Sequence, residues 1–434
     1  MGSLREDQMK NAKFPVLDTR LLLIAWVWVA IISGCATYRP EPIGKLSFKE
    51  HVQTKTKDGV NVSVAVLSAD ESEQAFGASL ADKGIQPVWL RIENTTDSGY
   101  LLLENKVDRD YYSPYEAAWK SHYFASAAAN RSMDQYFLDQ HIPLYIGPQQ
   151  TVSGFVYTNV DEGVKYVSVD LLGKGEYNSF WFVVEVLGLE ADYKRVDFDS
   201  LYTADEIINF QDDDALRIWL EELPCCVLGG DKETPGDPLN LVVINNIGMM
   251  LPGFISRGWD VTETMHSGAI WGTIMSSLFG ARYRTSPVSA LYLFGRAQDF
   301  SLQKARSTVD ERNHLRLWLA PVRYKGMFVF VGQISRDIGV RLSSKTFVTH
   351  KIDPAVDEAR TYLGLELFAS GRVAAYGYVK GVGRATLNEP RYNYTNDPYY
   401  TDGRRLVLIM ADKWTDILNI ERLDWLPPLI FRDQ

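Results

Sequence analysis

The residues of this chain best suited to chemistry are histidines, arginines and aspartates that recur in its second half. Imidazole titrates near neutral pH, and a guanidinium group can hold a phosphate or carboxylate with two hydrogen bonds. Together these groups suit general acid/base work on a phosphoester. The candidates for catalysis are His314, His350, Asp337 and Asp353, and the candidates for binding an anion are Arg316, Arg336 and Arg296.

Strands would have to position these side chains. If residues 313–319 form a strand, its period of two places His314 and Arg316 on one face and leucines on the other. Further strand candidates at 328–331 and 346–350 would deliver the later histidine, arginine and aspartates at their ends. The three strand ends could then converge on one cleft.

The same residues have other interpretations, and we favour a structural one. An Arg-Asp pair at a strand end is usually a salt bridge, and a histidine on a strand more often packs than catalyses. A metal site built from His314, His350 and Asp353 is chemically feasible, but His and Asp three residues apart are common by chance. Motifs for a nucleophilic serine, a zinc protease or a phosphate-binding glycine loop are missing from the sequence. We therefore predict no metal and no cofactor.

The beginning of the chain predicts a membrane anchor. An uncharged apolar run at 21–34 follows Lys10, Lys13 and Arg20, and it is shorter than the roughly 20 residues that a bilayer span needs. The run ends in Ile32-Ser33-Gly34-Cys35, which resembles the lipobox of bacterial lipoproteins. That resemblance implies acylation of Cys35 and cleavage just before it. Because Ala36 rather than aspartate follows, it also implies an outer-membrane lipoprotein facing the periplasm.

The alternative is an uncleaved signal anchor in the inner membrane, because Trp26 and Trp28 lie inside the apolar run. Both interpretations place the bulk of the chain outside the cytoplasm, in the cell envelope.

Composition excludes some functions. The 434 residues are 46% hydrophobic, which is ample for a large core, and 45 basic against 55 acidic residues give a formal charge of -10. Without a concentrated basic run, nucleic acid is not an expected partner. Acylation of Cys35 would leave only Cys225 and Cys226, which could form a vicinal disulfide or remain buried, inert thiols.

Hydrophobic periodicity predicts an α+β multidomain protein. Valines alternate with small or polar residues from Val60 to Val66, and similar alternation recurs up to about residue 186, which favours an antiparallel, immunoglobulin-like β-sandwich. A more helical insert is expected at 113–140, and an exposed loop at 229–238. A mixed α/β domain follows. The expected division is a signal peptide at 1–34, a lipid-anchored tether at 35–47, the sandwich at 48–190, a linker with a helix at 191–238, and the α/β domain at 239–434.

Four motifs in the second half resemble the LssY C-terminal domain family. They are TSPVSALYLFGR at 285–296, HLRLW at 314–318, SRDIG at 335–339 and THKIDP at 349–354, and the resemblance covers roughly residues 212–413. Lys351 departs from the family, where a second histidine is often expected, which weakens any role for a His-His pair. The family implies no reaction that can be named. Some relatives carry phosphatidic-acid-phosphatase-like membrane segments, which this chain lacks, so phosphatase chemistry is not transferred.

We therefore expect a lipid-anchored envelope protein that binds a ligand or an envelope protein partner and has no established catalytic activity. The alternative is a phosphoester hydrolase, or a protein that binds phosphate or lipid headgroups, with a His/Arg cleft in its C-terminal domain. Hydrolysis requires His314, His350, Arg316 and Arg336 to share that cleft.

Overall fold

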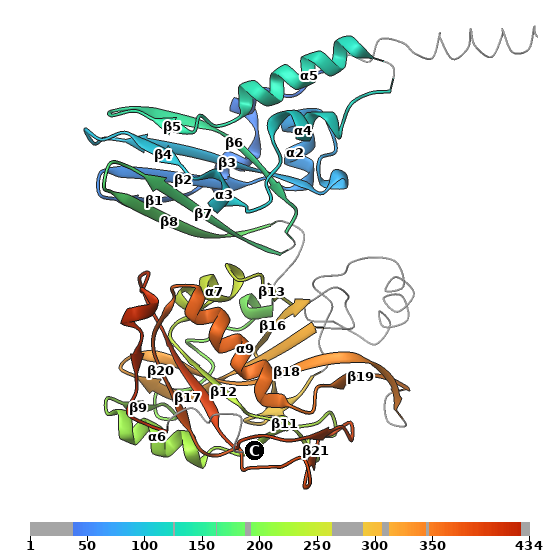
Figure 1. Cartoon of the computed structure of the whole chain (residues 1–434), viewed down its shortest axis with the longest axis vertical. Helices are drawn as coiled ribbons and strands as arrows, with labels where there is room; N and C mark the ends of the chain where they lie inside the picture. The colour runs from blue at the N-terminus through green and yellow to red at the C-terminus, as the bar shows by residue number, and fades with distance from the viewer. Residues whose placement is uncertain are drawn as a thin grey trace, which may run out of the picture.

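The computed structural model describes residues 38–124, 126–161, 163–186, 192–262, 290–305, 312–343 and 347–426, without the side chains of 340–350. Cys35 and the side chain of His350 therefore lie outside the described residues. The described chain is mostly β-sheet, with several antiparallel sheets and few helices. None of its helices is long and apolar enough to cross a membrane. Figure 1 shows an N-terminal domain above a larger C-terminal domain.

Two four-stranded sheets build the N-terminal domain. The first has the order β1 (Gln53–Lys57), β2 (Val60–Val66), β3 (Ile85–Asn94), β6 (Thr151–Asn159). The second has the order β5 (Tyr145–Ile146), β4 (Tyr100–Leu102), β7 (Val164–Leu172), β8 (Tyr177–Glu185). Alternate side chains of both sheets, such as Val62, Val167 and Phe182, share one core. The immunoglobulin likeness is not confirmed, because β2 pairs with β3 here, whereas the second strand of that fold pairs with the fifth.

Helices cover one side of this domain. They are α2 (Ala69–Phe76), α3 (Glu104–Val107), α4 (Pro114–Trp119) and α5 (Ala127–Gln140), with 3-10 turns η1 (Ile43–Lys45), η2 (Ser47–His51) and η3 (Ala81–Lys83). The expected helical insert thus contains α4 and α5. Phe76 and Phe137 pack these helices onto Phe155 and Tyr157 of β6 in a second core. Figure 1 shows α5 at the top of the domain, away from the C-terminal domain, with α4 and then α2 below it at the end of the sheets.

A mixed ten-stranded sheet forms the centre of the C-terminal domain. Its main path is β13 (Asp260–Val261), β16 (Phe300–Ala305), β17 (Arg312–Tyr324), β18 (Met327–Ser343), β12 (Leu241–Ile244), β23 (Arg405–Met410), β20 (Val373–Val379), β24 (Glu421–Arg422). β19 (Phe347–Ile352) pairs with β18, and β9 (Ile208–Phe210) pairs with β17. Smaller ladders join β10 (Cys226–Leu228), β11 (Pro235–Pro238), β14 (Tyr292–Leu293) and β15 (Arg296–Ala297), and join β21 (Arg391–Tyr392) to β22 (Pro398–Tyr399).

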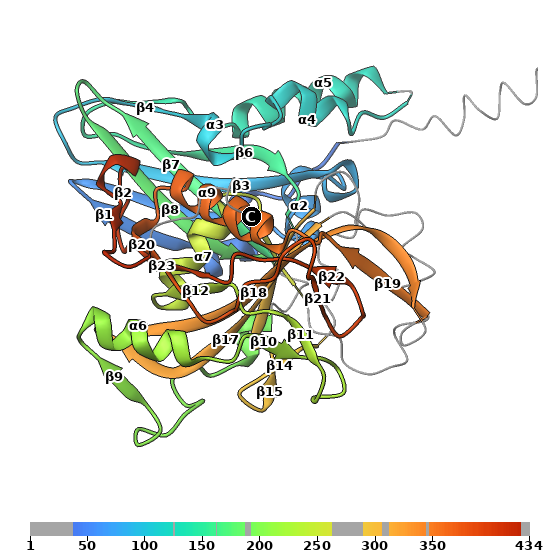
Figure 2. The ribbon, with the colours of Figure 1, turned by 60° about the horizontal axis from the view of Figure 1, so that its bottom comes forward.

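Helices pack on both faces of this sheet (Figure 2). On one face α7 (Ile247–Ile255) and α9 (Val356–Ala369) cover a core that includes Leu315, Leu317 and Phe330. On the other face α6 (Asp213–Glu222) covers a second core around Trp318 and Val331. Two further 3-10 turns are η4 (Asp192–Arg195) and η5 (Ile417–Asn419).

The longest strand pair, β17 with β18, turns through only two residues. Lys325 and Gly326 have φ values of 49° and 82°, the left-handed pair that a tight hairpin with correctly twisted strands requires. Beyond the turn, a register shift between Leu319 and Arg323 places Asn313 opposite Arg336 and His314 opposite Ser335. The turn and this shift together decide which side chains of the two strands lie side by side.

Arg405 is a fully buried cation that binds only backbone carbonyls. Its guanidinium donates to Leu220, Leu223 and Pro224 at the end of α6, and to Leu239 and Lys380, over 2.5–3.1 Å. Burial lowers the pKa of Arg405 to about 10, so the group stays charged at neutral pH. The cation satisfies carbonyls at the C-terminal, negative end of the α6 dipole and fixes α6 to the central sheet.

The two domains meet at Trp181 of β8. Lys55 Nζ of β1 lies 3.5 Å from the centre of the indole ring, and the Arg372 guanidinium at the start of β20 lies 4.3 Å from it. Such cation–π contacts are worth about 0.5–2 kcal/mol each. Val183 also packs against the C-terminal core, so the interface is apolar as well as cationic.

We predict that Gly326→Ala lowers the free energy of unfolding by about 1–2 kcal/mol, because a Cβ atom disfavours a positive φ. No atom lies within 4 Å of the Cβ position, so only backbone strain is tested. Urea denaturation measures the change. Gly248→Ala in α7, which is equally uncrowded but helical, is the control and should be neutral or slightly stabilising.

We also predict that Arg405→Met destabilises the fold by about 3–5 kcal/mol, because it leaves several buried carbonyls without donors. Arg422→Met, at an exposed position of β24, should change stability by no more than about 0.5 kcal/mol. Equal urea midpoints for the two variants would contradict the role assigned to Arg405.

Candidate functional site

On one face of three neighbouring strands, polar side chains form a continuous stretch beside the core around Trp318, and we call this stretch the polar face. Each of its side chains is at most 8% exposed. They alternate along their strands, and the strand register sets them side by side. The polar face consists of Ser301 and Gln303 of β16, Arg312, His314 and Arg316 of β17, and Gln333, Ser335 and Asp337 of β18.

His314 is at the centre of this face. Its Nε2 atom lies 2.7 Å from Oδ2 of Asp337, and Nε of Arg312 lies 3.9 Å from the same oxygen. Burial lowers the pKa of His314 to about 4, and this effect exceeds the opposite effect of the Asp337 carboxylate. The imidazole is therefore neutral at pH 7.

Arg316 begins a hydrogen-bond chain that leaves the central sheet. Its Nη1 donates to Oε1 of Gln333 (2.8 Å), and Nε2 of Gln333 donates to Oδ2 of Asp237 on β11 (3.1 Å). Asn393 in turn donates to the other oxygen of Asp237 (2.7 Å). Burial lowers the pKa of Arg316 to about 10 and raises that of Asp237. The Arg316 guanidinium and the Asp237 carboxylate are thus both buried, and a chain of hydrogen bonds connects them.

Asp237 and Asn393 were not among the candidates from the sequence. The loop at 229–238 was expected to be exposed, and for Asp237 this is wrong, because the side chain is only 8% exposed. Asn393 comes from the loop before β22, far along the chain. No spacing signal connects either residue to 314–316, because β11 and this loop reach the polar face only through the tertiary fold.

Arg336 does not join His314 and Arg316. It follows Ser335 directly, so it lies on the opposite face of β18, where Nε donates to Oδ1 of Asn313 (3.2 Å). Its guanidinium stacks over the ring of Tyr362 of α9, at 5.6 Å from the ring centre. The prediction that Arg336 shares a cleft with His314 and Arg316 is therefore wrong.

Two other candidates have local structural contacts. Asp353 accepts a hydrogen bond from the backbone N–H of Ala355 just before α9 (3.0 Å). Arg296 donates to both carboxylate oxygens of Asp299, to the Tyr202 hydroxyl and to the Leu319 carbonyl, over 2.6–3.0 Å. Arg296 fixes a loop to β17 and is not part of the polar face.

Cys225 and Cys226 are joined by a disulfide between α6 and β10. The Cys226 sulfur lies 3.6 Å from the hydroxyl of Tyr399, which is itself buried. Across the residues described here, no cluster of three or more His, Cys, Asp or Glu side chains could hold a metal ion.

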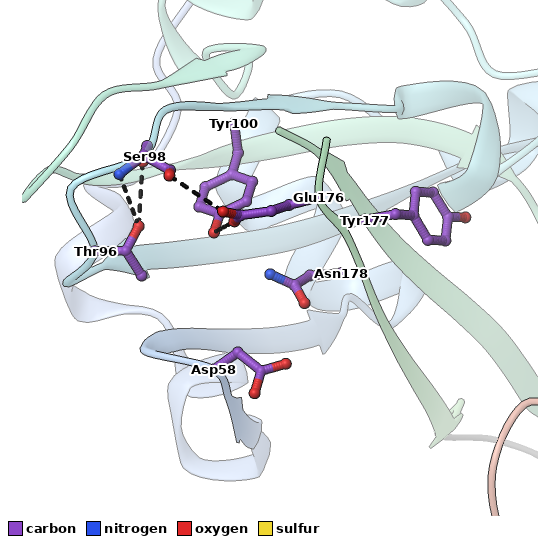
Figure 3. A pocket seen from close by; sticks show the side chains of 7 residues that line it. All are labelled: Asp58, Thr96, Ser98, Tyr100, Glu176, Tyr177 and Asn178. Carbon is purple, nitrogen blue, oxygen red and sulfur yellow. Dashed lines mark hydrogen bonds between the residues drawn. The ribbon is translucent and has the colours of Figure 1, made fainter. Parts of the chain in front are cut away.

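A pocket of about 470 Å³ opens at one end of the N-terminal domain, between three turns. Figure 3 shows Asp58 from the β1–β2 turn opposite Glu176 from the β7–β8 turn, with Asn178 between them. Glu176 accepts hydrogen bonds from Tyr100 (2.8 Å) and Ser98 (3.5 Å). With two carboxylates and no cation in its lining, the pocket disfavours anions and suits a neutral, hydroxyl-rich group.

Comparison with protein families identifies a match in the second half of the chain. Residues 222–404 match the family model described as LssY C-terminus, and this segment contains every residue of the polar face. A comparison with curated proteins found no match. The segment from the last residue of α6 to the residue before β23 therefore matches the LssY C-terminal domain family, as its four motifs suggested.

Proposed function

We propose that this chain is a non-enzymatic binding protein of the bacterial cell envelope. Its leader would be a lipoprotein signal that holds Cys35 at the outer membrane, facing the periplasm. The two-sheet domain would act as a spacer or docking module. The LssY-like domain would bind a partner or ligand.

The state of His314 carries this proposal. A general acid or base needs a pKa near the working pH and access to the substrate. His314 is instead buried, with a pKa of about 4, and its neighbours on the polar face are buried with it. This arrangement supports a structural charge network more than a reaction centre.

The N-terminal pocket supports binding. Its carboxylates can accept hydrogen bonds from hydroxyl groups, the Asn178 amide can donate and accept, and Tyr100 and Tyr177 supply aromatic surface. These are the groups that recognise a saccharide, and we propose an envelope glycan as the ligand of this pocket.

The second candidate function is a phosphoester hydrolase or a phosphate-binding protein. It is favoured by one observation, the presence of Arg312, His314 and Arg316 on a single face. Asp337 and Asp237 offset these charges, which is why we rank this function below binding.

We predict that His314 makes stability depend on pH. Its pKa in the folded chain, about 4, lies below the ordinary 6.5 of an unfolded histidine. Its contribution is therefore fully present above pH 6.5 and is lost as the pH falls towards 4, by up to about 3 kcal/mol. Urea denaturation between pH 7 and pH 4 measures this slope. In His314→Gln, which can still reach Asp337, the slope should become shallower. An unchanged slope would mean that His314 is not desolvated.

We predict that saccharides, and not phosphoesters, raise the thermal midpoint of the full chain, because a ligand of the native state stabilises it. Glu176→Gln should abolish the rise, and Glu389→Gln, an exposed carboxylate of the C-terminal domain, should preserve it. The proposal fails if phosphoesters raise the midpoint instead and His314→Gln removes that effect. Turnover of 4-nitrophenyl phosphate that is lost in the same variant would establish the hydrolase.

A further inference from the structure

Three large aromatic side chains project from the helical side of the N-terminal domain. Tyr115 and Trp119 of α4 are 62% and 61% exposed, and Phe124 in the loop before α5 is fully exposed. Tyr115 and Trp119 are four residues apart and so share one face of the helix. We call these three residues the aromatic surface. Exposed apolar patches of a folded domain often mark a site that meets a partner or a membrane.

The backbone beneath this surface is held firmly. Ser113 caps α4 by accepting a hydrogen bond from the N–H of Glu116 (3.2 Å), and the helix buries Ala117 and Ala118. The Asn130 side chain bonds both the N–H and the C=O of Tyr123, at 2.8 and 3.0 Å. The residue directly before Phe124 is thus fixed to α5, so the fold itself presents the phenyl ring to solvent.

The described chain begins beside the same helices. The Tyr38 ring packs edge-on against Tyr136 of α5, with 5.8 Å between ring centres, and the next neighbour in the chain, Arg39, runs past Gly77 at the end of α2. Tyr38 and Tyr123 pack against one core. Cys35 precedes Tyr38 by three residues, which span at most about 11 Å when fully extended. An anchor at residue 35 would keep these helices close to the bilayer.

The chemistry of the aromatic surface matches the membrane–water boundary. Tryptophan and tyrosine concentrate there because the ring is apolar and its N–H or O–H remains hydrated. Nearby charges are of both signs, with Glu116 and Arg131 exposed and Lys120 half-buried over the Tyr112 ring. Burial of apolar area, rather than attraction to anionic lipid, would therefore provide the affinity.

We propose that the aromatic surface docks onto the phospholipid bilayer. Trp119 and Phe124 enter the interfacial layer, and the C-terminal domain points away from it, because α4 and α5 lie towards the opposite side of the N-terminal domain (Figures 1 and 2). This inference rests on the proposed membrane anchor and adds an orientation that the anchor alone would not impose.

The test uses the full chain in phosphatidylcholine vesicles. Trp119→Cys, Phe124→Cys and Leu418→Cys are each labelled with bimane, and nitroxide-bearing lipid is added as the quencher. Leu418 is 90% exposed in η5 of the C-terminal domain and is the matched control. The unsubstituted chain reports labelling of the native cysteines. We expect strong loss of fluorescence at positions 119 and 124 and no loss at 418 above that background.

The outcomes separate the anchor from the surface. A chain that does not float with vesicles overturns the proposed anchor. A chain that floats, but whose labels at 119 and 124 are quenched no more than the label at 418, overturns the docking surface and leaves the anchor intact. As a second variant, Trp119→Ser with Phe124→Ser should reduce quenching of a label at Tyr115→Cys and keep the thermal midpoint, because these side chains pack against little.

Discussion

The register of the β17–β18 hairpin is the constraint on which the C-terminal domain depends. A two-residue turn at Lys325 and Gly326 and a register shift between Leu319 and Arg323 set how β17 pairs with β18, the longest strand of the sheet. Because side chains alternate, a slip by one residue would move the leucines of β17 into the polar face and His314 and Arg316 into the core under α7 and α9. The slipped register would bury charged groups in apolar surroundings. The pairing geometry and the burial pattern therefore select the same register.

That register has a free-energy cost, because it removes several charged groups on one face of the sheet from water. Burying an isolated charge costs several kcal/mol, whereas a network that pairs its members offsets much of the penalty. Here neutralisation of His314 removes one charge, Asp337 lies between His314 and Arg312, and Gln333 relays Arg316 to Asp237. This network therefore contributes little net stability. Its main effect is to favour one packing arrangement of β16, β17, β18 and β11. The same desolvation that makes the face specific makes it a poor place for proton transfer.

Period-two alternation predicted that His314 and Arg316 share a face opposite the leucines, and the family resemblance located the domain. Sequence reasoning failed at Arg336 for a definite reason. The strand was expected to end near residue 331, so that Arg336 and Asp337 could both turn towards one cleft. β18 instead continues to Ser343, and consecutive residues of a strand point to opposite faces. Asp237, Asn393 and the three turns of the N-terminal pocket come together only through long-range packing, which no local pattern encodes.

The contact at Trp181 connects the N-terminal domain to the C-terminal domain. An indole ring contacted by Lys55 of one domain and Arg372 of the other restrains their relative orientation, and Val183 adds apolar area at the same boundary. If the helices α4 and α5 face the bilayer, the two-sheet domain becomes a spacer of fixed direction. A flexible tether would let the LssY domain sample every orientation, including contact with lipid. Under this proposal a restrained spacer would hold it away from the membrane, where an envelope protein partner could reach it. Weakening the Trp181 contact should therefore alter partner binding more than it alters the stability of either domain.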